Sequence, residues 1–493
     1  MNQTVDPCEN FYEFACGGWV HRHLIPEDRS SVSQFSLIKD QLNAQLRWLV
    51  EEPPQDSEPG FIHKMKHMYR SCFNTTLIDT YAEEPLQKVL RVLGGWPVVE
   101  GPGWNASKFH WLNALIQYRN FGYSHNILLA LSVNPDLRNN TRYIIDVDQA
   151  SLGLPDRTYL LKGLNDSVLA AYLKLMTEAA QLLGADKKAA ETELRDALQF
   201  EIALANIDWD RYFNSLLVDK LTPNEPIIVV VPEFVKKFES LILRTPARTV
   251  ANYMVWRVVL QSYATLGKPW RERLQEFNAV LTGKTRETAR WEQCMGSLMG
   301  YLGIALSSLY VRHFFQEESK GPALDMVNFI LKEFMAILDN IDWMDEKTRQ
   351  RARGKAQAIQ PYIGYPEELL KDVLVEEHYR NVNGVNTQGE NIADNGGIKE
   401  AFNAYKKWVK ENGPEAGLPG LKYTPQQLFW ISAANIFCCK YRPEALKLRI
   451  LVDSHSPNPF RVIGPTSNTP EFAAEFNCPV GSPMNPANKC TVW

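Results

Sequence analysis

The sequence predicts a mainly α-helical protein with minor β-structure. Amphipathic periodicity of three to four residues recurs in long stretches along the chain, whereas strand patterns are few and short. Of the 493 residues 45% are hydrophobic and 11% aromatic, which is enough for a large packed core and too much for a disordered chain. A chain of this length is expected to form roughly three domains, or two large ones.

The first strong helical pattern covers residues 31–51, and it is followed by Pro53 and Pro54. Its apolar residues recur at steps of three and four: Phe35, Ile38, Leu42, Leu46 and Leu49. Further helices are expected at 186–207, 250–266, 285–315, 323–341, 345–360, 390–411 and 424–439. Asp345 is expected to cap the N-terminus of the helix that follows it.

Strand patterns are confined to three segments. Residues 126–133 and 142–147 flank a polar stretch and are expected to pair as a hairpin. Residues 227–231 are a candidate buried strand. After His455 the chain is dense in Pro, Asn and Ser, which predicts mainly loops and turns.

Charge and hydropathy exclude several classes of protein. With 53 basic and 57 acidic residues the net charge is −4, so the chain is not a strongly basic nucleic-acid binder. No uninterrupted apolar run approaches 18 residues, so no membrane span is expected. The first residues contain neither a basic region nor an apolar region, so no signal peptide is expected either.

The cysteines and the glycosylation sequons indicate the cellular compartment in which the protein resides. The eight cysteines are Cys8, Cys16, Cys72, Cys294, Cys438, Cys439, Cys478 and Cys490. Their gathering near the two ends suggests termini joined by disulfides; the alternative is scattered buried thiols in a cytosolic protein. Five N-x-S/T sequons occur at Asn2, Asn74, Asn105, Asn139 and Asn165. Together they favour a secreted or lumenal protein, which conflicts with the missing signal unless an N-terminal segment is absent.

The common catalytic signatures are absent. The sequence has no GxSxG, Walker A, GxGxxG or HExxH motif, and none of its nine histidines is followed by Glu. His63 and His67 are spaced to share one helical face, as zinc ligands require. Two lysines lie between them and no third ligand is nearby, so a solvated helix face is the preferred interpretation.

Two other places hold chemistry-bearing residues. Glu390 and Asp394 are spaced to share a helical face, as a ligand and its supporting carboxylate would, but an exposed acidic helix start explains the spacing equally. Asp453, His455 and Arg461 occur within nine residues of turn-rich chain. A loop histidine beside a carboxylate serves as acid, base or transition-state donor in many sites, and a structural histidine is the alternative.

With these residues assembled, the chain resembles the neprilysin and endothelin-converting-enzyme family of zinc endopeptidases nearly end to end. The resemblance is carried by DPCENFY at 6–12, FACGGW at 14–19, DQASLGLP at 148–155, NYMVWR at 252–257, WMD at 343–345, NGVNT at 383–387, GENIADNGG at 389–397, CPVGSPMNP at 478–486 and CTVW at 490–493. It implies a two-lobed ectodomain, with an N-terminal helical lobe over 1–380 and a remnant of the zinc-peptidase lobe over 381–493.

The resemblance also implies roles for individual residues. Glu390 matches the third zinc ligand, and Asp394 the carboxylate that orients a zinc-ligating histidine. His455 matches the histidine that stabilises the oxyanion, with Asp453 as its orienting partner, and Arg461 matches the arginine that binds a substrate carbonyl. The implied disulfides are Cys8–Cys478, Cys16–Cys438 and Cys72–Cys294.

The departure from the family pattern lies after His378. There the chain passes directly to residues 381–383, and the family's HExxH segment, with two zinc ligands and the general base, is missing. Cys490 resembles a cysteine whose partner lies in the missing segment, and Cys439 stands where the family has glycine. Both are therefore expected to be free, reactive or mispaired. The N-terminal lobe before about residue 365 is expected to be intact, and the loss is expected to expose apolar surface.

These observations predict a family member that is inactive as written. The parent reaction is zinc-dependent hydrolysis of small peptides before hydrophobic residues, and this chain is not expected to bind zinc tightly. The alternative is a non-catalytic binding or dominant-negative partner of a full-length homologue. The parent family is anchored at the plasma membrane and faces the outside, so an extracellular or lumenal location is expected.

Overall fold

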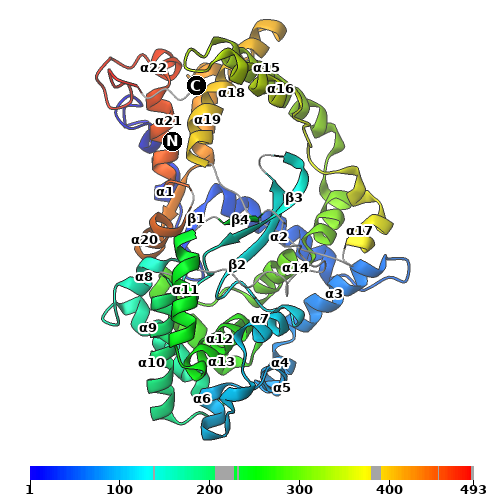
Figure 1. The fold of residues 1–493 in the computed structure, drawn as a ribbon. Coiled ribbons are helices and arrows are strands. Elements are labelled where there is room, and N and C mark those ends of the chain that lie inside the picture. The colour runs from blue at the N-terminus through cyan, green and yellow to red at the C-terminus, as the bar shows by residue number, and fades with distance from the viewer. Residues whose placement is uncertain (137–138, 206–226, 230–231, 379–389, 454, 490–493) are drawn as a thin grey trace. The chain divides into compact units, whose positions relative to one another are not determined.

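The computed structural model describes residues 1–136, 139–205, 227–229, 232–378, 390–453 and 455–489. Its contacts divide the chain into two units. Unit 1 comprises residues 1–73 and 288–493, and unit 2 comprises residues 74–287. Both are mainly helical, as the sequence predicts (Figure 1).

Unit 1 combines the two ends of the chain. Its helices are α1 (Phe11–Arg22), α2 (Gln34–Glu51), α3 (Gly60–Phe73), α14 (Arg290–Phe314), α15 (Lys320–Asn340), α16 (Glu346–Gln357), α17 (Asp372–His378), α18 (Glu390–Asn412), α19 (Pro425–Ile436), α20 (Pro443–Val452), α21 (Asn458–Asn468) and α22 (Pro470–Glu475). Its strands β1 (Ser31–Ser33) and β5 (Cys439–Tyr441) pair antiparallel. The boundary expected at 380/381 lies outside the described residues.

One aromatic core joins the beginning and the end of the chain within unit 1. Helix α1 packs against α19 and α21, as Figure 1 shows. The rings of Phe11, Trp430 and Phe472 meet edge to face at its centre and are fully buried. The disulfides Cys8–Cys478 and Cys16–Cys438 cross this core and are the pairs that the family resemblance implies.

A second core in unit 1 forms where α14 packs against α2 and α3. The disulfide Cys72–Cys294, also implied by the resemblance, links α3 to α14. Leu46 and Leu49 of α2 are buried here, but Phe35 is 56% and Ile38 is 63% exposed. The apolar stripe of α2 is therefore covered only in its C-terminal half.

Helix α14 is the one helix in the described parts of the chain with the length and apolar composition of a membrane span. The sequence interpretation, which looked for an uninterrupted apolar run, did not single it out. The helix is broken at Leu302, whose φ of −128° is not helical, and it carries Cys294 in a disulfide. These contacts are those of a core helix in a folded unit.

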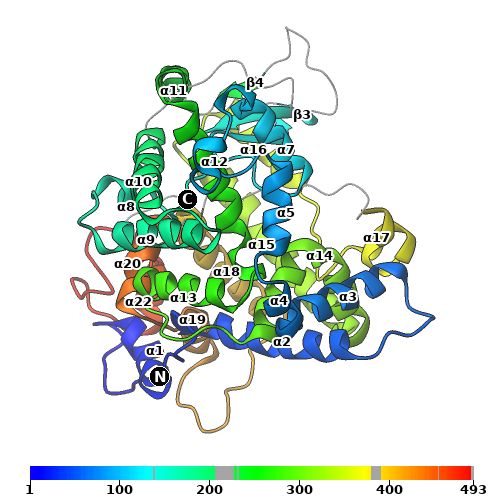
Figure 2. The ribbon, with the colours of Figure 1, turned by 90° about the horizontal axis from the view of Figure 1, so that it is seen from below.

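Unit 2 is a continuous segment with its own core. Its helices are α4 (Thr75–Tyr81), α5 (Glu84–Val92), α6 (Pro97–Glu100), α7 (Trp111–Asn120), α8 (Arg157–Leu161), α9 (Ser167–Leu182), α10 (Lys187–Leu204), α11 (Pro232–Arg244), α12 (Ala247–Ser262) and α13 (Lys268–Thr282). Helix α9 packs against α10 and α13 (Figure 2). The buried Tyr172 hydroxyl accepts a hydrogen bond from the Trp256 indole at 2.7 Å and so links α9 to α12.

The predicted hairpin is present in unit 2 with shifted ends. Strands β2 (Ala130–Asp136) and β3 (Asn139–Asp148) pair antiparallel, with Val133 opposite Ile145. Strand β4 (Ile227–Val229) adds to β3 in parallel and confirms the short strand predicted there. Residues 230–231 of that prediction lie outside the described part.

Two predictions of local structure near the C-terminus are wrong. The helix expected over 424–439 ends at Ile436, and Cys439 belongs to β5. The region after His455, expected to be mainly loops, contains α21 and α22. Pro459 and Pro470 lie in the first turn of these helices, where the missing amide hydrogen is not needed.

Candidate functional site

Asp453 and His455 form a hydrogen-bonded pair just after α20. Asp453 Oδ1 accepts a hydrogen bond from the His455 backbone nitrogen at 2.8 Å and lies 3.1 Å from His455 Nδ1. Its Oδ2 lies 3.0 Å from a guanidinium nitrogen of Arg449, one turn earlier on α20. The carboxylate therefore holds the imidazole on one side and is itself held by an arginine.

Arg461 lies on α21 and stacks on an aromatic ring. Its guanidinium carbon is 4.8 Å from the centre of the Phe437 ring. The start of α21 is fixed by Asn458, whose amide donates to the Phe437 carbonyl at 2.8 Å and accepts from the Tyr441 hydroxyl at 2.7 Å. The segment that joins α19 to α20 thus positions the helix that carries Arg461.

Glu390 and Asp394 lie in the first turns of α18, as the sequence predicts, but their side chains lie outside the described part of the chain. Helix α18 packs against α21, which carries Arg461, and against α15. Gly397 of α18 is exposed, and an added Cβ there would meet nothing within 4 Å.

A catalytic zinc site is not found among the described side chains. In the described part of the chain no three His, Cys, Asp or Glu side chains gather as metal ligands would. His63 and His67 lie on α3, with His67 exposed. Between them Lys66 is buried and ion-paired with Glu58 at 2.5 Å, so a cation already occupies that neighbourhood. Glu390 is the one zinc ligand that the family resemblance assigns.

Sequence reasoning missed three residues that build this site: Arg449, Phe437 and Asn458. The i, i+4 spacing of Arg449 and Asp453 is the signal for the first, but no helix is expected there from the sequence. The other two contacts join separate elements and leave no local signal.

The five sequon asparagines have different surroundings. Asn74, Asn105 and Asn165 are exposed, and each is in a loop or at a helix start of unit 2. The Asn2 side chain is hydrogen-bonded within the N-terminal segment. The side chain of Asn139 is outside the described part.

Comparison with known proteins defines the class to which this fold and these residues belong. The N-terminal profile of Peptidase family M13 matches residues 7–211 and 205–366, and its catalytic-domain profile matches residues 331–492. The chain belongs to Peptidase family M13. The N-terminal profile matches as two overlapping segments that meet at 205–211, so the match to that lobe is divided there.

The relatives include neprilysins and endothelin-converting enzyme-like proteins. Neprilysin-2 of Drosophila melanogaster is 32% identical over 676 aligned positions, covering 100% of this chain and 87% of the relative. Human endothelin-converting enzyme-like 1 is 30% identical, covering 100% and 85%, and human neprilysin is 27% identical, covering 100% and 90%. The alignment with Neprilysin-2 has 676 positions against 493 residues here, so at least 183 positions have no counterpart in this chain.

Solved structures confirm the mainly α fold. Zinc metalloprotease Zmp1 of Mycobacterium tuberculosis, in complex with an inhibitor, superposes with a TM-score of 0.77 at 17% identity, covering 97% of this chain and 96% of that one. PepO of Lactobacillus rhamnosis gives 0.72 at 17% identity, covering 97% and 98%. At this identity the likeness concerns the fold alone.

Proposed function

We propose that this chain is a member of family M13 that does not hydrolyse peptides by itself. The observation that carries the proposal is that no HExxH motif occurs among the 493 residues of this chain. The family is zinc-dependent, and Glu390 is the one zinc ligand that the family resemblance assigns in this chain.

The physical reason is the number of ligands. A catalytic zinc ion takes three protein ligands and keeps one position open for water. One carboxylate does not hold the ion tightly, and without the ion the pKa of the attacking water stays far above neutral. The retained pair Asp453–His455 and the retained Arg461 can orient a peptide carbonyl, but they supply no nucleophile.

A second role is that of a binding or dominant-negative partner of a full-length homologue. It is favoured by exposed apolar side chains on the C-terminal helices of unit 1. Ile436 is 47% exposed, and Ile450 and Phe460 are each 63% exposed. Co-purification of the two chains that survives non-reducing but not reducing electrophoresis supports this role.

We place the protein outside the cell or in the secretory lumen. Three disulfides in the structure and exposed sequons at Asn74, Asn105 and Asn165 support this location. A mobility shift after enzymatic removal of N-glycans is expected from protein made in a secretory host.

Zinc content tests the metal side of the proposal. We expect close to zero zinc per chain after exhaustive dialysis of the purified monodisperse protein, measured by elemental analysis. Glu390→Ala is expected to leave that value unchanged, as is the control Glu411→Ala, at an exposed position on the same helix. One zinc per chain that is lost in Glu390→Ala alone contradicts the proposal.

Hydrolysis tests the catalytic side separately. The pure chain is expected not to cleave a short peptide with an internal hydrophobic residue, with or without added zinc. Chelator-sensitive cleavage that persists through repurification, and is lost in His455→Ala, contradicts the proposal because it requires a working metal site.

A further inference from the structure

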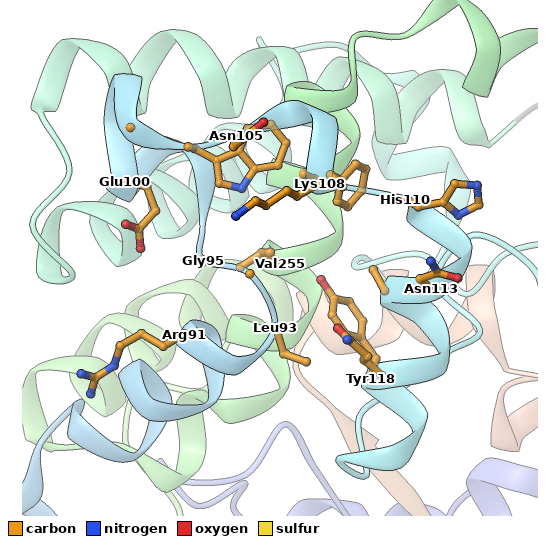
Figure 3. Close-up of a pocket in the computed structure, with 17 residues that line it drawn as sticks. Arg91, Leu93, Gly95, Glu100, Asn105, Lys108, His110, Asn113, Tyr118 and Val255 are labelled. Carbon is orange, nitrogen blue, oxygen red and sulfur yellow. The ribbon is translucent and has the colours of Figure 1, made fainter.

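Unit 2 contains a cavity of about 500 Å³ that no part of the proposed function uses. It lies between the turn that follows α5, the short segment 101–110 and helix α7, and two residues of α12 complete its lining, with Val255 in the middle of the view in Figure 3. Its lining residues all belong to unit 2. The volume suits a small organic molecule.

The floor and one wall of the cavity are apolar. Leu93 and Val255 are at least nine-tenths buried and form the floor. The rings of Trp104 and Phe109, with centres 5.8 Å apart, form a half-buried aromatic wall. These surfaces can bury an aliphatic or aromatic body.

Tyr118 supplies the polar feature that points to a ligand. The residue is 1% exposed, and no described residue makes a hydrogen bond with its hydroxyl. Figure 3 shows the hydroxyl directed into the cavity. Burial raises the pKa of Tyr118, so the group stays a neutral O–H donor. A hydroxyl donor that opens into a cavity can pair with an acceptor bound there.

The charges around the cavity indicate what that acceptor is. Lys108 and Arg91 line it, and neither forms an ion pair with any described residue. In Figure 3 the Lys108 side chain extends above Val255 toward Gly95, and the Tyr118 hydroxyl lies on the other side of Val255. One acid, Glu100, lines the rim and folds over Gly95, where an added Cβ would lie 2.8 Å from the Glu100 Cγ. The lining therefore carries more positive than negative charge.

We propose that this cavity binds a small organic anion with an apolar body, of the class of aryl- or alkyl-carboxylates. The carboxylate accepts the hydrogen bond of Tyr118 and lies near the Lys108 ammonium, while the body lies between Leu93, Val255 and the aromatic wall. The proposal concerns a site within unit 2 and does not depend on whether the chain hydrolyses peptides.

Binding of 4-phenylbutyrate to the full chain, measured by calorimetry, tests the proposal. We expect saturable binding with one site per chain and a dissociation constant in roughly the millimolar range, which is ordinary for a ligand of this size. The neutral amide, 4-phenylbutyramide, has nearly the same shape and is expected to bind at least roughly tenfold more weakly because it lacks the charge.

Two conservative variants locate the site. Tyr118→Phe removes only the hydroxyl, which has no hydrogen-bond partner among the described residues, so the variant should fold normally and bind the carboxylate roughly tenfold more weakly. Lys108→Gln removes the charge and leaves a polar side chain that is one atom shorter, and it is expected to weaken binding of the carboxylate but not of the amide. The controls are Tyr143→Phe and Lys188→Gln, both at exposed positions of unit 2 outside the cavity lining.

Asn105 lies at the rim of the cavity, so the effect of a glycan attached to it must be distinguished from the effect of the ligand. Ser107→Ala abolishes the sequon and keeps Asn105 itself, and this variant is expected to bind at least as well as the wild type.

Absence of saturable binding at millimolar concentration in both the wild type and Ser107→Ala overturns the proposal. Equal binding of acid and amide, or binding unchanged in both Tyr118→Phe and Lys108→Gln, also overturns it.

Discussion

Cys439 shows at the scale of a single residue how the surroundings change the chemistry of a group. The sequence predicts a free, reactive or mispaired thiol, and the structure shows it free but buried, with 8% of its surface exposed. The neighbouring Tyr12 hydroxyl exchanges hydrogen bonds with its backbone nitrogen and oxygen, each at 3.1 Å. Burial raises the pKa of the Cys439 thiol and so disfavours the reactive thiolate. Cys490, predicted to behave likewise, lies outside the described residues.

Alkylation kinetics check the state of Cys439. At pH 7 to 8 the native thiol is expected to react at least roughly tenfold more slowly than the same thiol in denaturant, with mass spectrometry identifying the site. Because burial raises the pKa of the thiol in the folded state, the Cys439 thiol makes its full contribution to the free energy of unfolding below the unfolded-state pKa. That contribution is lost as the pH rises through the folded-state pKa. Equal alkylation rates in the native and denatured chain would show that the Cys439 thiol is not buried in the folded protein.

At the scale of elements, helix ends depend on local chemistry that the sequence displays. The Asp345 carboxylate accepts hydrogen bonds from the Thr348 backbone at 2.9 Å and from its hydroxyl at 2.6 Å, which confirms the predicted N-cap of α16. Helix ends that depend on contacts with distant elements are predicted less accurately from the sequence. Helix α19 stops where β5 pairs with β1, a strand more than 400 positions away along the chain.

Removing the Asp345 cap tests this element directly. Asp345→Ala is expected to cost about 1 kcal/mol and to speed amide exchange in the first turn of α16, because a backbone N–H loses its acceptor. Asp342→Ala, at an exposed position outside the helix, is the control and should change stability by less than about 0.5 kcal/mol. Similar effects of the two substitutions would count against a specific role of the cap.

At the scale of the whole molecule, the chain leaves unit 1 after Phe73 and returns at Thr288. The disulfide Cys72–Cys294 joins α3 and α14 close to both crossing points. Unit 2 is a continuous segment of the chain, and its core includes the fully buried Trp96, Trp256 and Trp270.

Residues 74–287 are therefore expected to fold without the rest of the chain. The isolated fragment should give a helical circular dichroism spectrum and one cooperative thermal transition. The matched comparison is the same fragment with Trp256→Ala, which should lose about 3 to 5 kcal/mol and much of that cooperativity. A fragment with no cooperative transition would show that unit 2 depends on unit 1 for its core.

The sequence by itself determined the helical class, the hairpin, most long helices and the Asp345 cap, because periodicity and capping act over a few neighbouring residues. It also showed directly that HExxH is absent, since that motif is read within five positions. Only the tertiary structure decided that α21 continues through a proline-rich stretch and that Phe35 and Ile38 are left exposed. It alone brought Phe437 to Arg461 and opened a cavity beside the Tyr118 hydroxyl. These features depend on contacts between segments far apart in the chain, and local sequence pattern carries no record of such contacts.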